Sequence, residues 1–157
     1  MTSSIKVQKF AGGSAIAFVM GLALFISPAT ASEADTLAVR AAAEQMFVAM
    51  PSDYYTIKVV PAAKEIATGV PVVIDVREPN EFAIEHIRGS KNVPLGSLVK
   101  LIKAFPSDKT APILVYCKSG HRGAMGLTVL RMLGYKNARS IYGGIVGWKT
   151  AGFPVTN

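Results

Sequence analysis

The chain has 157 residues, 50% of them hydrophobic, which fits one globular domain and excludes a disordered or fibrous protein. Its 17 basic and 10 acidic residues give a net charge of +7, but the lysines never form a run. This even spread argues against a nucleic-acid-binding protein, which usually gathers its basic residues in a patch or tail. The excess is instead consistent with some attraction for small anions.

The first 31 residues have the three parts of a secretory signal peptide. Lys6 and Lys9 precede an uncharged, mostly apolar stretch over residues 10–26, and Ala29-Thr30-Ala31 has the small-x-small form that signal peptidase cuts. We therefore expect a periplasmic or otherwise exported protein with residues 1–31 as signal peptide. The alternative is an uncleaved membrane anchor, although a stretch this short and rich in glycine is at the lower limit for spanning a bilayer. Cleavage removes two lysines and no acid, which lowers the net charge to +5.

Helical and strand patterns alternate over the rest of the chain. Residues 32–50 have helical spacing and, with a connector to residue 55, form an N-terminal extension. The patterns predict an extended edge piece at 93–95, strands at 56–60, 70–76, 112–116 and 138–142, and helices at 61–68, 81–86, 96–104, 124–133 and 145–150. The runs 70–76 and 112–116 are almost wholly apolar, which is typical of strands buried on both faces of a parallel sheet. The alternation predicts an α/β fold with a mostly parallel sheet.

The only cysteine of the chain stands at the carboxyl end of the second apolar strand, where open α/β sheets bind their ligands. It begins the loop Cys117-Lys118-Ser119-Gly120-His121-Arg122. A lone cysteine is either buried and inert or reactive. Backbone N–H groups of a tight loop, the start of the next helix and the neighbouring cationic side chains favour a thiolate. We therefore interpret Cys117 as a nucleophile.

This loop resembles the active-site loop of the rhodanese family, which reads Cys, two variable residues, Gly, one variable residue and Arg. Two further stretches are similar to the other motifs of that family: residues 75–95, beginning Asp75-Val76-Arg77, and residues 142–155, beginning Tyr142-Gly143-Gly144. Together the three motifs span about residues 57–155. The resemblance implies a single rhodanese-like domain over residues 56–157, a sandwich with a central, mostly parallel five-stranded sheet flanked by helices.

The resemblance also implies a thiosulfate sulfurtransferase. By this resemblance Cys117 would take a sulfane sulfur from a donor such as thiosulfate, become a persulfide, and pass the sulfur to a thiophilic acceptor such as cyanide or a thiol. Its partners would be a small anionic donor and a small or protein acceptor, with no nucleic acid, no cofactor and no metal. Asp75 and Arg77 are expected to form a structural pair that supports the loop. The residues expected to bind substrate are Lys118, Ser119, Gly120, His121 and Arg122.

Two other functions stay open at this point. One is a sulfur-carrier or partner-binding module without enzymatic turnover. The other is a phosphatase or arsenate reductase, whose related loops carry seven residues from Cys to Arg, while the six residues here form a tighter cup that suits one sulfur atom. The chain also departs from the family pattern at Gly123, where a serine often follows the arginine, and we expect this to remove one hydrogen bond at the helix start.

Overall fold

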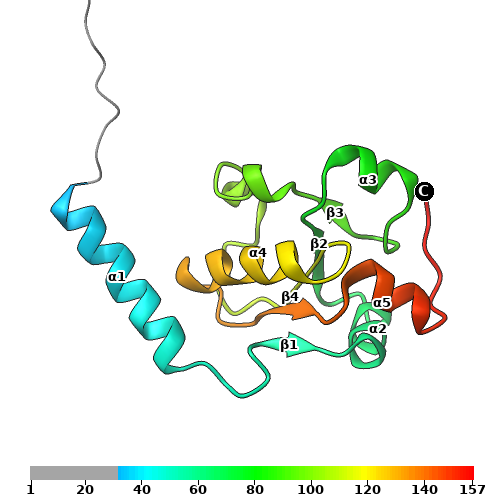
Figure 1. Cartoon of the computed structure of the whole chain (residues 1–157), viewed down its shortest axis with the longest axis horizontal. Coiled ribbons are helices and arrows are strands. Elements are labelled where there is room, and N and C mark those ends of the chain that lie inside the picture. The colour runs from blue at the N-terminus through cyan, green and yellow to red at the C-terminus, as the bar shows by residue number, and fades with distance from the viewer. Residues whose placement is uncertain (1–31) are drawn as a thin grey trace, which may run out of the picture. The chain divides into compact units, whose positions relative to one another are not determined.

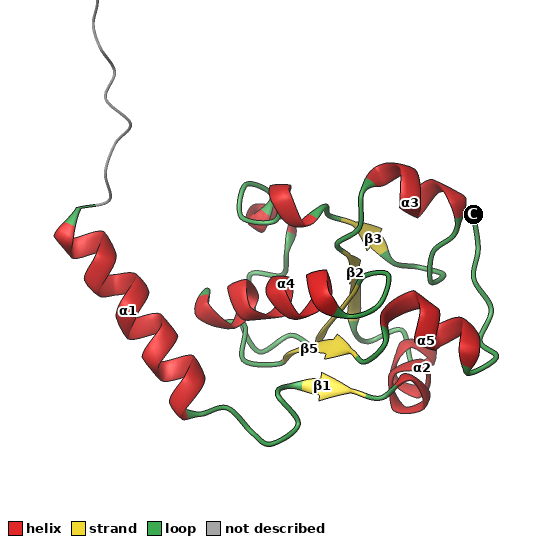
Figure 2. Ribbon diagram, viewed as in Figure 1, coloured by secondary structure: helices red, strands yellow, loops and turns green. Residues whose placement is uncertain are grey.

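The computed structural model describes residues 32–157, so the expected signal peptide lies outside the described residues. Five parallel strands form one sheet in the order β1-β5-β4-β2-β3 (Figure 2). This confirms the predicted α/β fold, and every strand pair in the sheet is parallel. The strands are β1 (Thr56–Ile57), β2 (Val72–Asp75), β3 (Lys91–Asn92), β4 (Ile113–Tyr116) and β5 (Ala138–Ile141).

Helices cover both faces of the sheet (Figure 1). The alternation of side chains along the strands decides which residues face each set of helices. From central strand β4, Ile113 and Val115 face the cluster that contains Leu127 and Leu130 of α4 (His121–Met132). Leu114 of β4 faces the opposite cluster, which α2 (Val59–Ala67) and α5 (Gly144–Thr150) complete. Burial on both faces explains why β4 is apolar throughout. Among the described helices, none is both long and apolar enough to cross a membrane.

Several expected helix boundaries were wrong. The helix expected over 96–104 is replaced by two short 3₁₀ turns, η1 (Leu95–Ser97) and η2 (Ile102–Ala104). Among the side chains of this segment that the structure describes, Leu98 and Phe105 are buried and Leu95 and Ile102 are partly buried, and they do not form the continuous stripe of an amphipathic helix. Helix α3 (Pro79–Ile84) begins at Pro79 because proline is favoured at a first helical position. Helix α4 begins at His121, three residues before the expected start.

The N-terminal extension forms helix α1 (Glu33–Val48), as expected, with a capping box at its start. Asp35 N–H donates to the Ser32 hydroxyl at 3.1 Å, and the Ser32 backbone N–H donates back to the Asp35 carboxylate at 3.2 Å. Met46 is the only buried residue of this helix. Tyr55, in the following connector, places its ring 3.4 Å from the guanidinium of Arg131 on α4. Helix α1 therefore contributes little to the core.

Candidate active site

Cys117 follows β4 directly, and only 1% of its surface is exposed to solvent. The loop turns back so tightly that the backbone N–H of Gly120 donates to Cys117 Sγ at 3.2 Å. Gly120 has a φ of +114°, a conformation that residues with a Cβ rarely adopt, and helix α4 starts at the next residue. The sulfur is therefore enclosed and has a hydrogen-bond donor of the kind that suits a negatively charged atom.

Helix α5 fixes the carbonyl groups of the loop from outside. Ile145 N–H donates to the Cys117 carbonyl at 2.8 Å, and Val146 N–H donates to the Lys118 carbonyl at 3.0 Å. Gly144 makes this approach possible, because a Cβ on it would lie 2.3 Å from the Cys117 carbonyl oxygen. Its φ is +57°. In the sequence, Gly144 stands out only as part of the C-terminal motif. The pair of glycines directly before a helix is the sequence feature that could have indicated its close approach to the loop.

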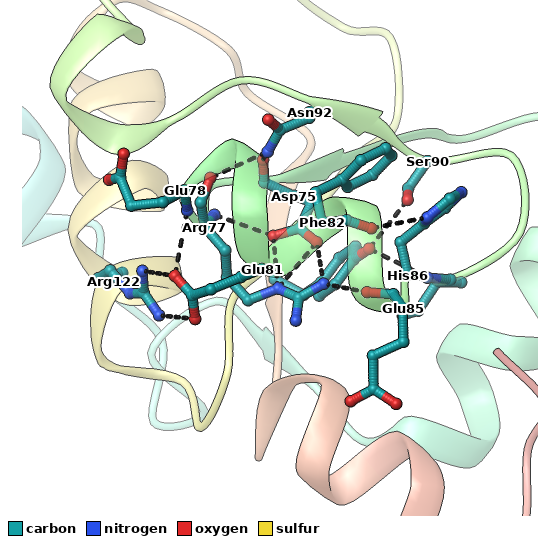
Figure 3. A network of polar contacts seen from close by, with 12 residues as sticks. Asp75, Arg77, Glu78, Glu81, Phe82, Glu85, His86, Ser90, Asn92 and Arg122 are labelled. Carbon is teal, nitrogen blue, oxygen red and sulfur yellow. Dashed lines mark hydrogen bonds and ion pairs between the residues drawn. The ribbon is translucent and has the colours of Figure 1, made fainter. Parts of the chain in front are cut away.

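Arg122, expected to bind substrate, forms a two-bond ion pair with Glu81 of α3 (Figure 3). The nitrogen–oxygen distances are 2.6 and 2.8 Å. The hydrogen bonds from Arg122 are the largest cause that lowers the pKa of Glu81 from 4.5 to about 2, and the same bonds raise the pKa of Arg122. The charge of Arg122 is thus already matched, and its role in binding the donor stays a prediction. Sequence reasoning missed Glu81, although it lies in the upstream motif.

Asp75 and Arg77 form the expected pair, and both are buried. Arg77 Nε lies 3.0 and 2.9 Å from the two carboxylate oxygens of Asp75, and Nη2 lies 2.6 Å from Oδ2. Arg77 Nη2 also donates to the Glu85 carbonyl at 2.6 Å, and the Asn92 amide donates to the Asp75 and Arg77 carbonyls. Within residues 32–157 none of these bonds reaches residues 118–122. The pair braces the ends of α3 and β3, and its expected support of the loop stays a prediction.

The remaining loop residues line the two cavities that flank the loop. Lys118 borders a cavity of about 220 Å³ between the loop, α3 and α5. Ser119, Gly120 and His121 border a second cavity of about 350 Å³ on the side of β5, together with Tyr142. Ser119 Oγ and His121 Nδ1 lie 3.2 Å apart. The loop residues at the two cavities differ in charge. Lys118 brings a cation to the first cavity, while Ser119, Gly120 and His121 bring two uncharged residues and one imidazole to the second.

Comparison with known proteins gives the family. Residues 60–151 match the family model of the rhodanese-like domain. The chain belongs to the rhodanese-like family. Thiosulfate sulfurtransferase GlpE of Ectopseudomonas mendocina is 34% identical over 92 residues, which are 59% of this chain and 82% of that relative. A rhodanese-related protein of Thermoplasma volcanium superimposes with a TM-score of 0.60 at 32% identity, over 66% of this chain and 98% of that structure.

Other relatives of this rhodanese chain are longer. The probable adenylyltransferase/sulfurtransferase MoeZ of Mycobacterium tuberculosis is 39% identical over 79 residues, which are 48% of this chain but only 19% of MoeZ. In an uncharacterised Synechocystis relative, the match covers 45% of the length of that relative. The chain thus spans less than half the length of these relatives. The match to MoeZ covers only the rhodanese-like part of this chain. It carries no information about the activity of the rest of MoeZ.

Gly123, where the chain departs from the rhodanese pattern, lies close to Ser140 of β5. A Cβ on Gly123 would lie 3.0 Å from Ser140 Oγ and 3.6 Å from the Cys117 backbone nitrogen. Ser140 is itself buried. Its hydroxyl therefore occupies space that a serine side chain at position 123 would need, so the two positions are complementary in this chain.

Proposed function

We propose that this protein is a thiosulfate sulfurtransferase that works through a persulfide on Cys117. The observation that carries the proposal is the enclosed Cys117 sulfur at the carboxyl end of β4, which accepts the Gly120 N–H at 3.2 Å inside a six-residue loop. The family supports a role in sulfur transfer, and the relative GlpE is named for thiosulfate sulfurtransferase activity.

The proposed reaction has two displacements at sulfur and needs no cofactor. The Cys117 thiolate attacks the outer sulfur of thiosulfate, the sulfur–sulfur bond of the donor breaks, and sulfite leaves with the bonding electron pair. The protein then carries a persulfide. An acceptor thiolate or cyanide attacks the outer sulfur, the persulfide bond breaks, and the Cys117 thiolate is released. No net oxidation or reduction of the protein occurs over the cycle.

The loop supplies donors where negative charge gathers in both steps. Because α5 holds the Cys117 and Lys118 carbonyls from outside, two acceptor groups of the loop are already occupied. The Gly120 N–H remains on the sulfur, and exposed Lys118 is the nearest cation in sequence. We propose that the charge of Lys118 attracts the anionic donor toward the loop from a distance, while Arg122, held by Glu81, keeps the loop in shape.

A sulfur-carrier module is the second candidate, and the match to MoeZ favours it. MoeZ is named as an adenylyltransferase/sulfurtransferase, and its matched part is a small fraction of its length. In such a module Cys117 would still form a persulfide but would deliver it to a protein partner instead of turning over with small acceptors. A phosphatase or arsenate reductase is disfavoured, because the six-residue loop is tight and Arg122 is already paired.

Two measurements on the same preparation test the proposal. Intact mass after thiosulfate treatment should show one added sulfur atom on wild type and none on Cys117→Ser. Thiocyanate formation from thiosulfate and cyanide should then show catalytic turnover by wild type. An added sulfur without turnover would indicate the carrier module. If wild type shows neither an added sulfur atom nor thiocyanate formation, sulfur transfer is overturned. Hydrolysis of a phosphate ester would then be the activity to assay.

A further inference from the structure

The cavity of about 220 Å³ lies directly beside the first two residues of the active-site loop. Ile145 and Val146 line it, and their N–H groups donate to the carbonyls of Cys117 and Lys118. Lys118 and Arg77 also line it. Cys117 itself does not line the cavity, so a molecule that reacts at Cys117 would place a second group there by extending past Lys118, the next residue. At this volume it suits an end group, because pockets for whole ligands measure about 300–1,000 Å³.

Arg77 directs an unused donor into the cavity. Its side chain is only 4% exposed, and Nε and Nη2 are occupied by Asp75 and the Glu85 carbonyl. Nη1 makes no hydrogen bond within residues 32–157, and Figure 3 shows it directed away from Asp75 and toward helix α5. Nη1 is not among the fully buried side-chain nitrogens that lack a partner in the described residues, so it stays open to the cavity and can donate to an acceptor from a ligand.

The charges around the cavity leave room for one anion. Three of the cations at or next to it are paired with a carboxylate: Arg77 with Asp75, Arg122 with Glu81 and Lys149 with Glu85. Lys118 has no ion-pair partner in the described part of the chain. One uncompensated positive charge and one unused guanidinium N–H are the features that favour a carboxylate or a similar oxyanion.

We infer that this cavity binds the anionic end of the sulfur acceptor, and that the acceptor class is a small thiol carrying a carboxylate. The acceptor assignment rests on the proposed function, whereas the anion site does not. The carboxylate contacts Arg77 Nη1 and Lys118, and the thiol reaches the persulfide on Cys117. The alternative source of the same chemistry is the donor, whose sulfonate would then occupy the cavity.

Binding without chemistry tests the anion site first. Propionate titrated into ¹⁵N-labelled Cys117→Ser protein should shift the Arg77 side-chain resonances and the backbone amides of residues 145–149, while n-propanol should not. Lys118→Gln should weaken propionate binding about fivefold or more, as loss of a charge-assisted contact predicts. Lys100→Gln removes an exposed lysine that lines none of the described cavities, and it should bind propionate as the parent does. Absence of shifts at Arg77, or equal weakening by both variants, overturns the site.

Competition and kinetics then separate acceptor from donor. Thiosulfate added to the propionate complex should leave the Arg77 shifts in place, and displacement of propionate would assign the cavity to the donor. With thiosulfate as donor, kcat/KM for 3-mercaptopropionate relative to 3-mercapto-1-propanol should fall about fivefold in Lys118→Gln and stay constant in Lys100→Gln. Both thiols draw on the same persulfide, so this ratio reports the acceptor step. Propionate binding without sulfur transfer would leave the anion site standing and remove the proposed function. Sulfur transfer with an unchanged ratio would leave the proposed function standing and remove the acceptor assignment.

Discussion

Cys117 is the residue on which every step of the proposed reaction depends. In Cys117→Ser the hydroxyl has a similar shape but cannot form a persulfide and is a far poorer nucleophile near neutral pH. We expect the variant to fold normally and to show no thiosulfate-to-cyanide transfer above background. The measurement is thiocyanate formation by both proteins at equal concentration, with circular dichroism to confirm folding. Appreciable transfer by the serine variant would mean that the reaction does not pass through Cys117.

Gly144 is the residue at which α5 and the loop approach too closely for any side chain. Alanine there would place Cβ 2.3 Å from the Cys117 carbonyl oxygen and 2.8 Å from the Lys118 carbonyl carbon and oxygen, all of them backbone atoms. We expect Gly144→Ala to displace the loop, to abolish sulfur transfer and to lower the free energy of unfolding by more than the backbone conformation alone costs.

Gly152 provides the matched control for this prediction. It also has a positive φ, of +82°, but a Cβ on it would meet nothing within 4 Å. Gly152→Ala should therefore lose only the about 1–2 kcal/mol of a left-handed residue and keep its activity. Urea denaturation and the transfer assay on both variants make the comparison. Equal losses in the two would show that close packing against the loop is unimportant.

How far the site could be predicted from the sequence depends on the separation of its parts. Cys117 and its loop neighbours were predictable, because they are contiguous and follow an apolar run. The Asp75–Arg77 pair was also predictable, since its members are two residues apart. The Glu81–Arg122 pair joins residues 41 positions apart, and the bonds from α5 to the loop depend on how a helix docks on a sheet. Local patterns carry neither kind of information.

At the scale of elements, the ion pair between Glu81 and Arg122 connects helix α3 to helix α4. The pKa of Glu81 is lowered to about 2, chiefly by its hydrogen bonds with Arg122. A carboxyl group whose pKa is lower in the folded than in the unfolded protein stabilises the fold above the unfolded pKa of about 4.5, and this stabilisation is lost as the pH falls toward about 2. The pair thus holds α3 against the loop most firmly at neutral pH.

Glu81→Gln tests this connection. We expect the variant to lower the free energy of unfolding by about 1–2 kcal/mol at pH 7, because a charged hydrogen-bonded pair is lost. The difference from wild type should shrink as the pH falls from about 5 to about 2, since wild type then loses the same interaction. Urea denaturation at several pH values measures both effects. Glu44→Gln, which breaks the exposed Arg40–Glu44 pair on α1, should change little at any pH, and an equal response in both variants would contradict the assignment.

The elements themselves were predicted best where the hydrophobic pattern is longest. Strands β2 and β4 and helix α1 lie within their expected ranges. The helix expected over 96–104 is absent, because Leu98 within the range and Phe105 just after it are held by 3₁₀ turns, which leave no helical pattern. The early start of α4 depends on the φ of Gly120, which is set by the fold of the loop and not by local propensity.

At the scale of the whole molecule, we propose export with removal of residues 1–31. The reason is the order of basic residues, apolar stretch and Ala29-Thr30-Ala31. N-terminal sequencing of the protein from its native envelope should therefore begin at or near Ser32. Ala31→Glu, which places a large charged side chain at the cleavage position, should block processing and retain the precursor. A native protein that begins at Met1 and sediments with membranes would support the anchor instead.

The presence of a single, enclosed cysteine has a consequence for how sulfur is stored. In proteins that pair a reactive cysteine with a resolving one, the second thiol can discharge the first from within. Here the chain has no such second thiol, so under the proposed function sulfur bound to Cys117 would leave only when another molecule arrives. Each chain would then store one sulfur atom, and the lifetime of the persulfide would depend on the concentration of thiophilic molecules around it.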